Sequence, residues 1–89
     1  MSAAVVVVFD RIGRTHTVAP MRAALTLPDP DLDALLTAIG KYARPFLRSS
    51  EIDVAAEIDP ESGEGSGMIL VGGFRNAGSF TVSRDGAQS

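Results

Sequence analysis

The stretch SAAVVVVFD, residues 2–10, decides the fold because it is apolar at both odd and even positions. Successive side chains of a β-strand point to opposite faces of the sheet, so a strand here presents valines on both faces. The run has no basic n-region, is followed at once by Asp10 and Arg11, and falls far short of the roughly 20 residues that span a bilayer. We therefore interpret it as a central strand and expect no membrane association.

Length and composition predict one small globular domain. Of the 89 residues, 45% are hydrophobic and 21% are charged, a balance typical of folded proteins. This length is near the lower limit for a self-sufficient core, so additional burial against a partner would stabilise it. The absence of cysteine leaves no disulfide, thiolate nucleophile or Cys-based zinc site, and we expect a cytoplasmic protein. A single domain is expected over residues 1–89, with residues 85–89 as a frayed tail.

Turn and breaker residues divide the first third of the chain into extended segments. Residues 3–12 form the first predicted strand, and a tight turn centred on Gly13 leads into a second one over residues 15–19. Pro20 has no amide N–H to donate to a ladder, so the second strand is expected to end there or to lie at an edge. Residues 21–27 are expected to continue as an extended segment.

The period of the apolar residues then changes to that of a helix. The apolar residues at helical spacings are Leu32, Leu35, Leu36, Ile39, Ala43 and Phe46. This spacing places them on one face, as in an amphipathic helix. Asp29 is the expected N-cap, with Pro30 at the first helical position. Pro45 lacks an amide donor and predicts a kink or a stop near residue 44.

The second half of the chain returns to a period of two. Residues 52–58 alternate as in a strand with one wet face, and residues 59–67 form a polar loop. Residues 68–74 are a second stretch apolar on both faces, and residues 79–83 alternate again. The predicted fold is α+β and two-layered: one mostly antiparallel sheet of about five strands, in chain order ββαβββ, with a single helix packed on one face. The two doubly apolar strands are expected at its centre, flanked by the alternating ones.

One helix covers only one face of a sheet, so the other apolar face of the two central strands needs a second cover. The side chains that we assign to this face are Ala4, Val6, Val8, Ile69 and Val71. A valine-sized side chain left in water forfeits roughly 1.5 to 3 kcal/mol relative to full burial, against a typical stability of about 5 to 15 kcal/mol. We therefore predict a small non-enzymatic protein-interaction module that is homodimeric through its sheet.

The reactive residues form no recognisable catalytic or metal-binding pattern, so we predict no catalytic residue, metal ligand or cofactor. His16 is the only histidine, and it is expected beside Arg11, which disfavours a protonated or metal-bound ring. The aspartates at positions 29, 31 and 33 are accounted for by the start of the helix. The glycines of residues 63–67 precede an apolar strand and alternate with an acid, unlike a phosphate-binding loop.

The charge distribution keeps two other partner classes open. The net charge is −3, with a basic excess in the first half and an acidic excess after residue 48. Arg11, Arg14 and Arg22, on the basic hairpin, are the candidate contacts of a nucleic-acid-associated regulator. The acidic half is the candidate surface of an inhibitor that docks a basic partner. Because affinity for phosphates comes mainly from neutralising cations, the negative net charge weighs against nucleic acid, and we favour a protein partner.

Overall fold

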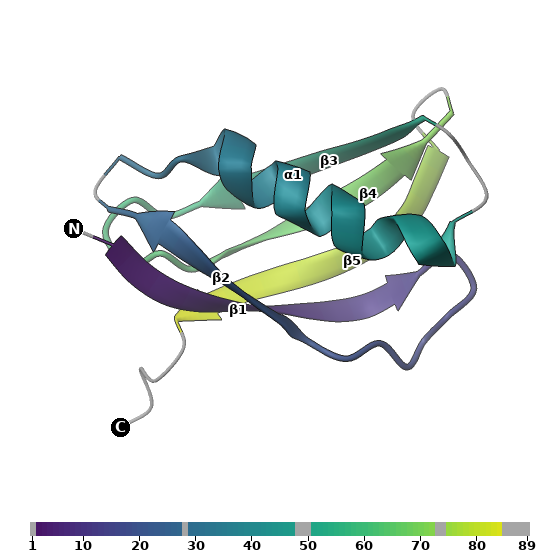
Figure 1. The fold of residues 1–89 in the computed structure, drawn as a ribbon, viewed down its shortest axis with the longest axis horizontal. Helices are drawn as coiled ribbons and strands as arrows, with labels where there is room; N and C mark the ends of the chain where they lie inside the picture. Colours follow the sequence, from purple (N-terminus) through teal and green to yellow (C-terminus); the bar gives the residue numbers. More distant parts are fainter. Residues whose placement is uncertain (1, 28, 48–50, 73–74, 85–89) are drawn as a thin grey trace.

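The computed structural model describes residues 2–27, 29–47, 51–72 and 75–84 and confirms the predicted fold class (Figure 1). The elements in chain order are β1 (Ser2–Ile12), β2 (Met21–Thr26), α1 (Leu32–Ala43), a 3₁₀ turn η1 (Arg44–Phe46), β3 (Ile52–Ile58), β4 (Gly65–Val71) and β5 (Arg75–Arg84). Within the described residues, these strands form one antiparallel sheet in the order β2-β1-β5-β4-β3. The predicted tail, residues 85–89, lies outside them.

The sheet curls into a half-barrel that holds α1 on its inner side (Figure 1). The helix contacts β2 and β3, the two edge strands, because the curl brings both edges toward it. Figure 1 shows α1 lying across the sheet, with β3 and β4 behind its upper side and β1 and β2 below it. One layer of helix and one layer of sheet therefore enclose the core, as predicted.

Local sequence sets both ends of α1. The carboxylate of Asp31 accepts a hydrogen bond from the backbone N–H of Ala34 at 3.4 Å and is the N-cap. The expected cap at Asp29 was two residues too early; the helix begins at Leu32, after Pro30. At the other end the helix stops at Ala43, and the chain continues as η1 with a proline in its first turn, as Pro45 predicted.

The core lies between α1 and the inner face of the sheet. Its buried members are Val5, Val7, Phe9, Ile12, Leu25, Leu27, Leu35, Ile39, Ala43, Ile69, Ala77, Phe80 and Val82. The ring of Phe9 stacks on Tyr42 with centroids 5.2 Å apart and lies 5.9 Å from Phe80. Tyr42 also donates its hydroxyl to the backbone carbonyl of Ala19. These contacts fix the end of the helix against β1 and against the segment that leads into β2.

The second strand lies later in the chain than the sequence predicted. A tight turn brings Thr15 back beside Ile12, but residues 16–20 form no strand, and the ladder begins at Met21. Met21 pairs with Val7, so β2 runs beside the first half of β1 only. Residues 21–27, which the sequence predicts as an extended segment, contain β2. Pro20 has no N–H to donate to a ladder, so the strand begins after it.

The position of β5 is a second correction. The alternating strand near the C-terminus lies at the centre of the sheet, with the doubly apolar β1 and β4 on either side of it. Its inner residues Phe80 and Val82 are buried, while Thr81 and Ser83 are exposed on the other face. Alternation along the sequence predicts a flanking strand, but a central strand also alternates when the helix covers only one face.

Candidate interaction surfaces

One face of the sheet is turned away from α1, and we call it the open face. Its three inner strands, β1, β5 and β4, contribute Ala4, Val6, Val8, Ser79, Thr81, Ser83, Ser66, Met68 and Leu70. In the register, Val8 lies opposite Thr81, and Thr81 lies opposite Ser66. The open face therefore has a row of short polar side chains at its centre and apolar rows on both sides.

Two large apolar side chains on this face are strongly exposed. Val8 on β1 is 47% exposed and Met68 on β4 is 42% exposed. Beside Met68 lies a shallow hollow of about 470 Å³, lined by Ala55, Ala56, Glu57, Ser66, Gly67 and Met68. Small residues on β3 and β4 create this hollow, so the open face can be approached closely by another surface.

The structure divides the five residues that the sequence assigned to one interface. Ala4, Val6 and Val8 lie on the open face. Ile69 is fully buried on the helix-covered face, and Val71 packs against the same core. The even positions of β1 and the odd positions of β4 thus belong to opposite faces. On β4 the open face carries Met68 and Leu70, which the sequence reasoning missed, because two doubly apolar strands do not reveal their relative phase.

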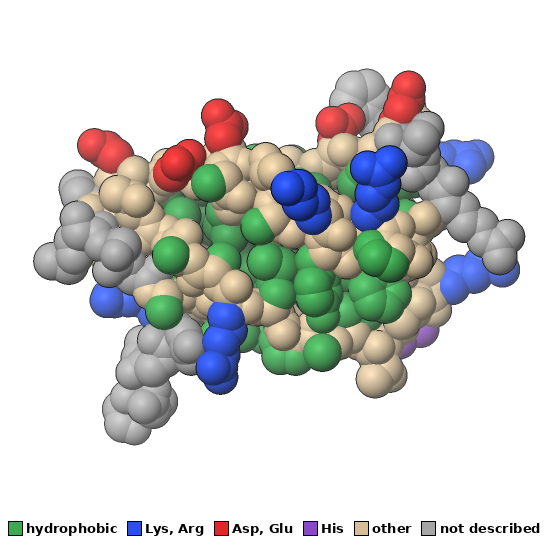
Figure 2. Space-filling view, viewed as in Figure 1, with side chains coloured by type: hydrophobic (Ala, Val, Ile, Leu, Met, Phe, Trp, Pro, Cys, Tyr) green, Lys and Arg blue, Asp and Glu red, His purple; other side chains and the backbone are tan. Residues whose placement is uncertain are grey.

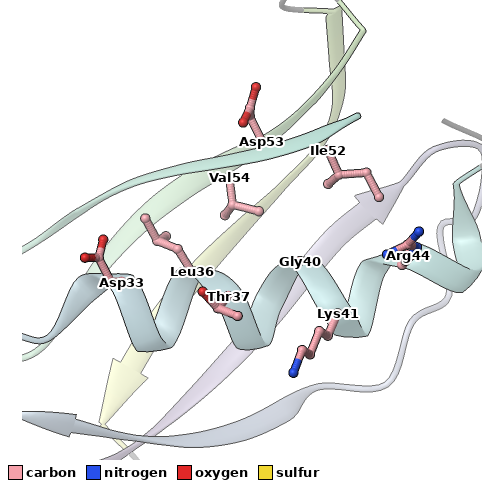
Figure 3. Close-up of a pocket in the computed structure, with 9 residues that line it drawn as sticks. All are labelled: Asp33, Leu36, Thr37, Gly40, Lys41, Arg44, Ile52, Asp53 and Val54. Carbon is pink, nitrogen blue, oxygen red and sulfur yellow. The ribbon is translucent and has the colours of Figure 1, made fainter. Parts of the chain in front are cut away.

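A groove of about 380 Å³ runs between α1 and the edge strand β3 (Figure 3). The helix contributes residues spaced three and four apart, which share one helical face. The residues that line the groove are Asp33, Leu36, Thr37, Gly40, Lys41 and Arg44 from the helix and the turn after it, and Ile52, Asp53 and Val54 from β3. Figure 3 shows Leu36 and Val54 pointing toward one another between helix and strand, whereas Asp53 points away. Gly40 adds room, since a Cβ there would lie 3.8 Å from the side chain of Val54.

The candidate nucleic-acid contacts do not gather into one patch. Arg11 donates a hydrogen bond to the carbonyl of Gly13, and Arg14 lies exposed in the adjoining turn. Arg22 lies on β2 opposite Val6. Along β1, Val6 is about 16 Å from Arg11, at roughly 3.3 Å per residue. Figure 2, which views the helix side, shows acidic side chains along the upper rim, on the side of β3.

The other candidate sites of the sequence are dispersed. His16 is exposed in the segment between the turn and β2. In the part of the chain that the structure describes, no three acidic or histidine side chains lie close enough to hold a metal ion. No helix among the described residues is long and apolar enough to cross a membrane. A third hollow, of about 470 Å³, lies between the turn at residues 13–15 and the pair Phe46 and Leu47. We take the open face and the groove beside β3 as the two candidate interaction surfaces.

No known protein family, characterised protein or solved structure shows significant similarity to this chain.

Proposed function

We propose that the protein is a small non-enzymatic interaction module of the cytoplasm that dimerises through the open face of its sheet. The observation that carries this proposal is the pair of apolar rows on that face, headed by Val8 and Met68, which are about half exposed in the isolated chain. Exposed apolar rows of this kind are typical of surfaces that meet a partner.

The strand order favours a second copy of the chain as that partner. In this dimer the open faces of two copies stack on one another, and a two-fold axis runs between them, parallel to β5. Because β1 and β4 lie on opposite sides of β5, this axis places β1 of each copy over β4 of the other. The valines of β1 then face the hollow beside Met68, twice in the same interface. The short side chains of Thr81 and Ser83 at the centre allow the sheets to approach to the usual separation of about 10 Å.

Charge at the two margins of the open face agrees with this arrangement. Arg22 lies at the β2 margin, and Asp53 and Glu57 lie at the β3 margin. The same two-fold axis sets the β2 margin of one copy over the β3 margin of the other, so opposite charges meet. An axis perpendicular to the strands would set like margins together and is disfavoured, because complementary charge across an interface selects the orientation.

Light scattering coupled to size exclusion tests the proposal at tens of micromolar protein. We expect a mass of twice the 9.3 kDa chain for the wild type. Val6→Asp or Val8→Asp should dissociate or unfold the dimer, since each puts a charge into the apolar row, whereas Arg14→Ala in the exposed turn should leave the mass unchanged. A monomeric wild type whose open-face amides are nonetheless protected from exchange would contradict the proposal.

The nucleic-acid alternative finds less support in the geometry. Arg11, Arg14 and Arg22 are spread over about 16 Å of strand, and the rim on the side of β3 is acidic. Its test is binding to a short duplex at low salt. Binding that weakens steeply as salt is raised, and that is lost in Arg14→Ala, would favour this alternative over the interaction module.

A further inference from the structure

The outer edge of β3 carries backbone groups that no other strand of the described chain pairs with. Gly72 donates its N–H to the carbonyl of Glu51, and Asp59 donates its N–H to the carbonyl of Glu64. Residues 51 and 59 therefore form hydrogen-bonded pairs with residues 72 and 64, which flank β4. In an antiparallel pair such residues alternate with ones whose N–H and C=O point the other way. By this alternation, the even residues of β3, among them Val54 and Ala56, direct their N–H and C=O groups to the outside.

β3 lacks several of the features that usually keep an edge strand from pairing, although Asp53 and Glu57 place two charges on it. Natural edges are commonly protected by charged side chains, above all lysine, by proline, by a bulge, by a very short strand or by a covering helix or loop. Residues 52–58 contain neither lysine nor proline, and their register with β4 is regular over all seven residues. The edge is thus long enough and regular enough to accept another strand.

The groove beside this edge has room for the side chains of an added strand. A sixth strand next to β3 continues the curl of the half-barrel around α1, so its inward side chains enter the groove between helix and strand. There they meet Leu36, Val54 and the open space at Gly40. Leu36 and Val54 favour apolar residues at every second position of the added strand, although polar side chains, among them Thr37 and Arg44, also line the groove.

The outward side chains of the added strand meet acids. Asp53 and Glu57 are exposed on the outward face of β3, and their charges are of the same sign. Opposite charges on directly neighbouring strands are stabilising, and like charges are destabilising. Pairing of β3 with β3 of a second copy is disfavoured for this reason, because a two-fold axis at Ala55 sets Asp53 opposite Glu57 of the second copy.

We propose that the edge of β3 binds an extended segment of another protein as a sixth, antiparallel strand, one that alternates apolar residues toward the groove with basic residues toward Asp53 and Glu57. Backbone hydrogen bonds give such strand addition its affinity, and alternate side chains give it specificity. The backbone edge that binds the segment is separated by β4 and β5 from the open-face valines on β1. Asp53 and Glu57, however, also face Arg22 of the second copy in the proposed dimer, so the two sites share these acids.

The first test uses three acetylated, amidated eight-residue peptides, with fluorescence anisotropy as the readout. A peptide that alternates valine and lysine should bind at least tenfold more tightly than one that alternates valine and glutamate, or than a scrambled valine–lysine peptide, and its affinity should fall with salt. Amide shifts in a two-dimensional NMR spectrum should centre on residues 52–58. Equal affinity of the three peptides, or shifts centred on β2, would overturn the proposal.

The second test locates the hydrogen bonds without altering the protein. In antiparallel pairing the valine amides of the peptide face β3, since residues opposite each other share a face of the sheet. N-methylation of the valines should abolish binding, and N-methylation of the lysines should change it less than threefold. Equal loss from both modifications, or loss from lysine methylation alone, would contradict antiparallel addition at this edge.

Three variants of the protein complete the design. Ala56→Pro removes an N–H that points outward and spares the ladder to β4, so it should weaken the valine–lysine peptide at least tenfold while the far-ultraviolet spectrum stays unchanged. The double variant Asp53→Lys, Glu57→Lys should reverse the preference in favour of the valine–glutamate peptide. Val8→Thr, which weakens the dimer, should not weaken peptide binding, because dissociation leaves the edge of β3 intact and frees Asp53 and Glu57 from the second copy. Failure of the double variant to reverse the preference would refute the charge rule.

Discussion

Replacing Val8 by threonine is predicted to weaken the dimer while leaving the fold of each chain intact. Threonine keeps the branched shape and the strand propensity of valine but adds a hydroxyl. Val8 is 47% exposed in the isolated chain, so nearly half of its surface is left for a second copy to bury. Full burial of a valine contributes roughly 1.5 to 3 kcal/mol, and the remaining half therefore contributes about 0.7 to 1.5 kcal/mol per chain.

The two-fold symmetry of the dimer doubles this contribution. A change to the chain alters both halves of the interface, so the lost methyl burial and the cost of burying the added hydroxyl together should reach about 1.5 to 3 kcal/mol of dimer free energy. Since about 1.4 kcal/mol corresponds to a factor of ten, the dissociation constant should rise roughly 10- to 150-fold. The isolated chain should lose little, because the same side chain is already half in water there.

Sedimentation equilibrium over a hundredfold range of concentration measures this dissociation constant. The matched variant Thr81→Val makes the opposite change on the neighbouring strand, where Thr81 pairs with Val8, and should tighten the dimer. A Val8→Thr protein that dissociates no more readily than the wild type, within twofold, would refute the assignment of the open face as the interface.

Three further predictions concern the fold and are read from thermal or urea unfolding. Gly67→Ala should destabilise the fold by about 1 to 3 kcal/mol or more, because the added Cβ would lie 2.3 Å from a backbone oxygen of β3. Gly40→Ala should stabilise it by roughly 0.5 to 1 kcal/mol, because the added Cβ would lie 3.8 Å from the nearest side chain of β3. Equal effects of the two substitutions would contradict the packing around both glycines. Ile39→Ala should cost about 2 to 5 kcal/mol, since Ile39 is fully buried, and a loss under 1 kcal/mol would place it outside the core. Asp31→Ala should cost roughly 0.5 to 1 kcal/mol by removing the helix N-cap, and no loss would show that another residue caps α1.

Periodicity was sufficient to predict the elements and their order. The helical stripe ending near Pro45 and the period-two segments before and after it gave the α+β layout, because burial on one face imposes these spacings directly. The N-cap shifted by two residues, from Asp29 to Asp31, since several aspartates near a helix start satisfy the same local rule. The second strand shifted from residues 15–19 to β2 because its position depends on pairing with β1, which is not a local property.

The candidate interface depended on information that a single sequence lacks. Apolar residues on both faces of β1 and β4 indicated correctly that one face lacks cover from the helix. Which β4 residues share a face with Val8 depends on the strand order and on the register through β5. A shift of one residue in the register of a strand moves each of its side chains to the other face of the sheet. For this reason the sequence predicts Ile69 at the interface, whereas the structure places it in the core.

The edge of β3 could not be recognised before the strand order was known. Residues 52–58 gave the alternation of a half-buried strand, but nothing local distinguishes an edge strand from the central β5, which alternates in the same way. The groove requires that α1 and β3 lie side by side, which the curl of the sheet provides. Tertiary arrangement, and not propensity, therefore defines both candidate surfaces.

Isotope-filtered NMR on a mixture of labelled and unlabelled protein shows whether a second copy covers the open face. Such a spectrum records only contacts between different chains. We expect intermolecular contacts between the methyl groups of Val6 or Val8 in one chain and those of Met68 or Leu70 in the other. A spectrum without intermolecular contacts at tens of micromolar or above, or with contacts only to helix-side residues such as Phe46, would contradict the proposed dimer.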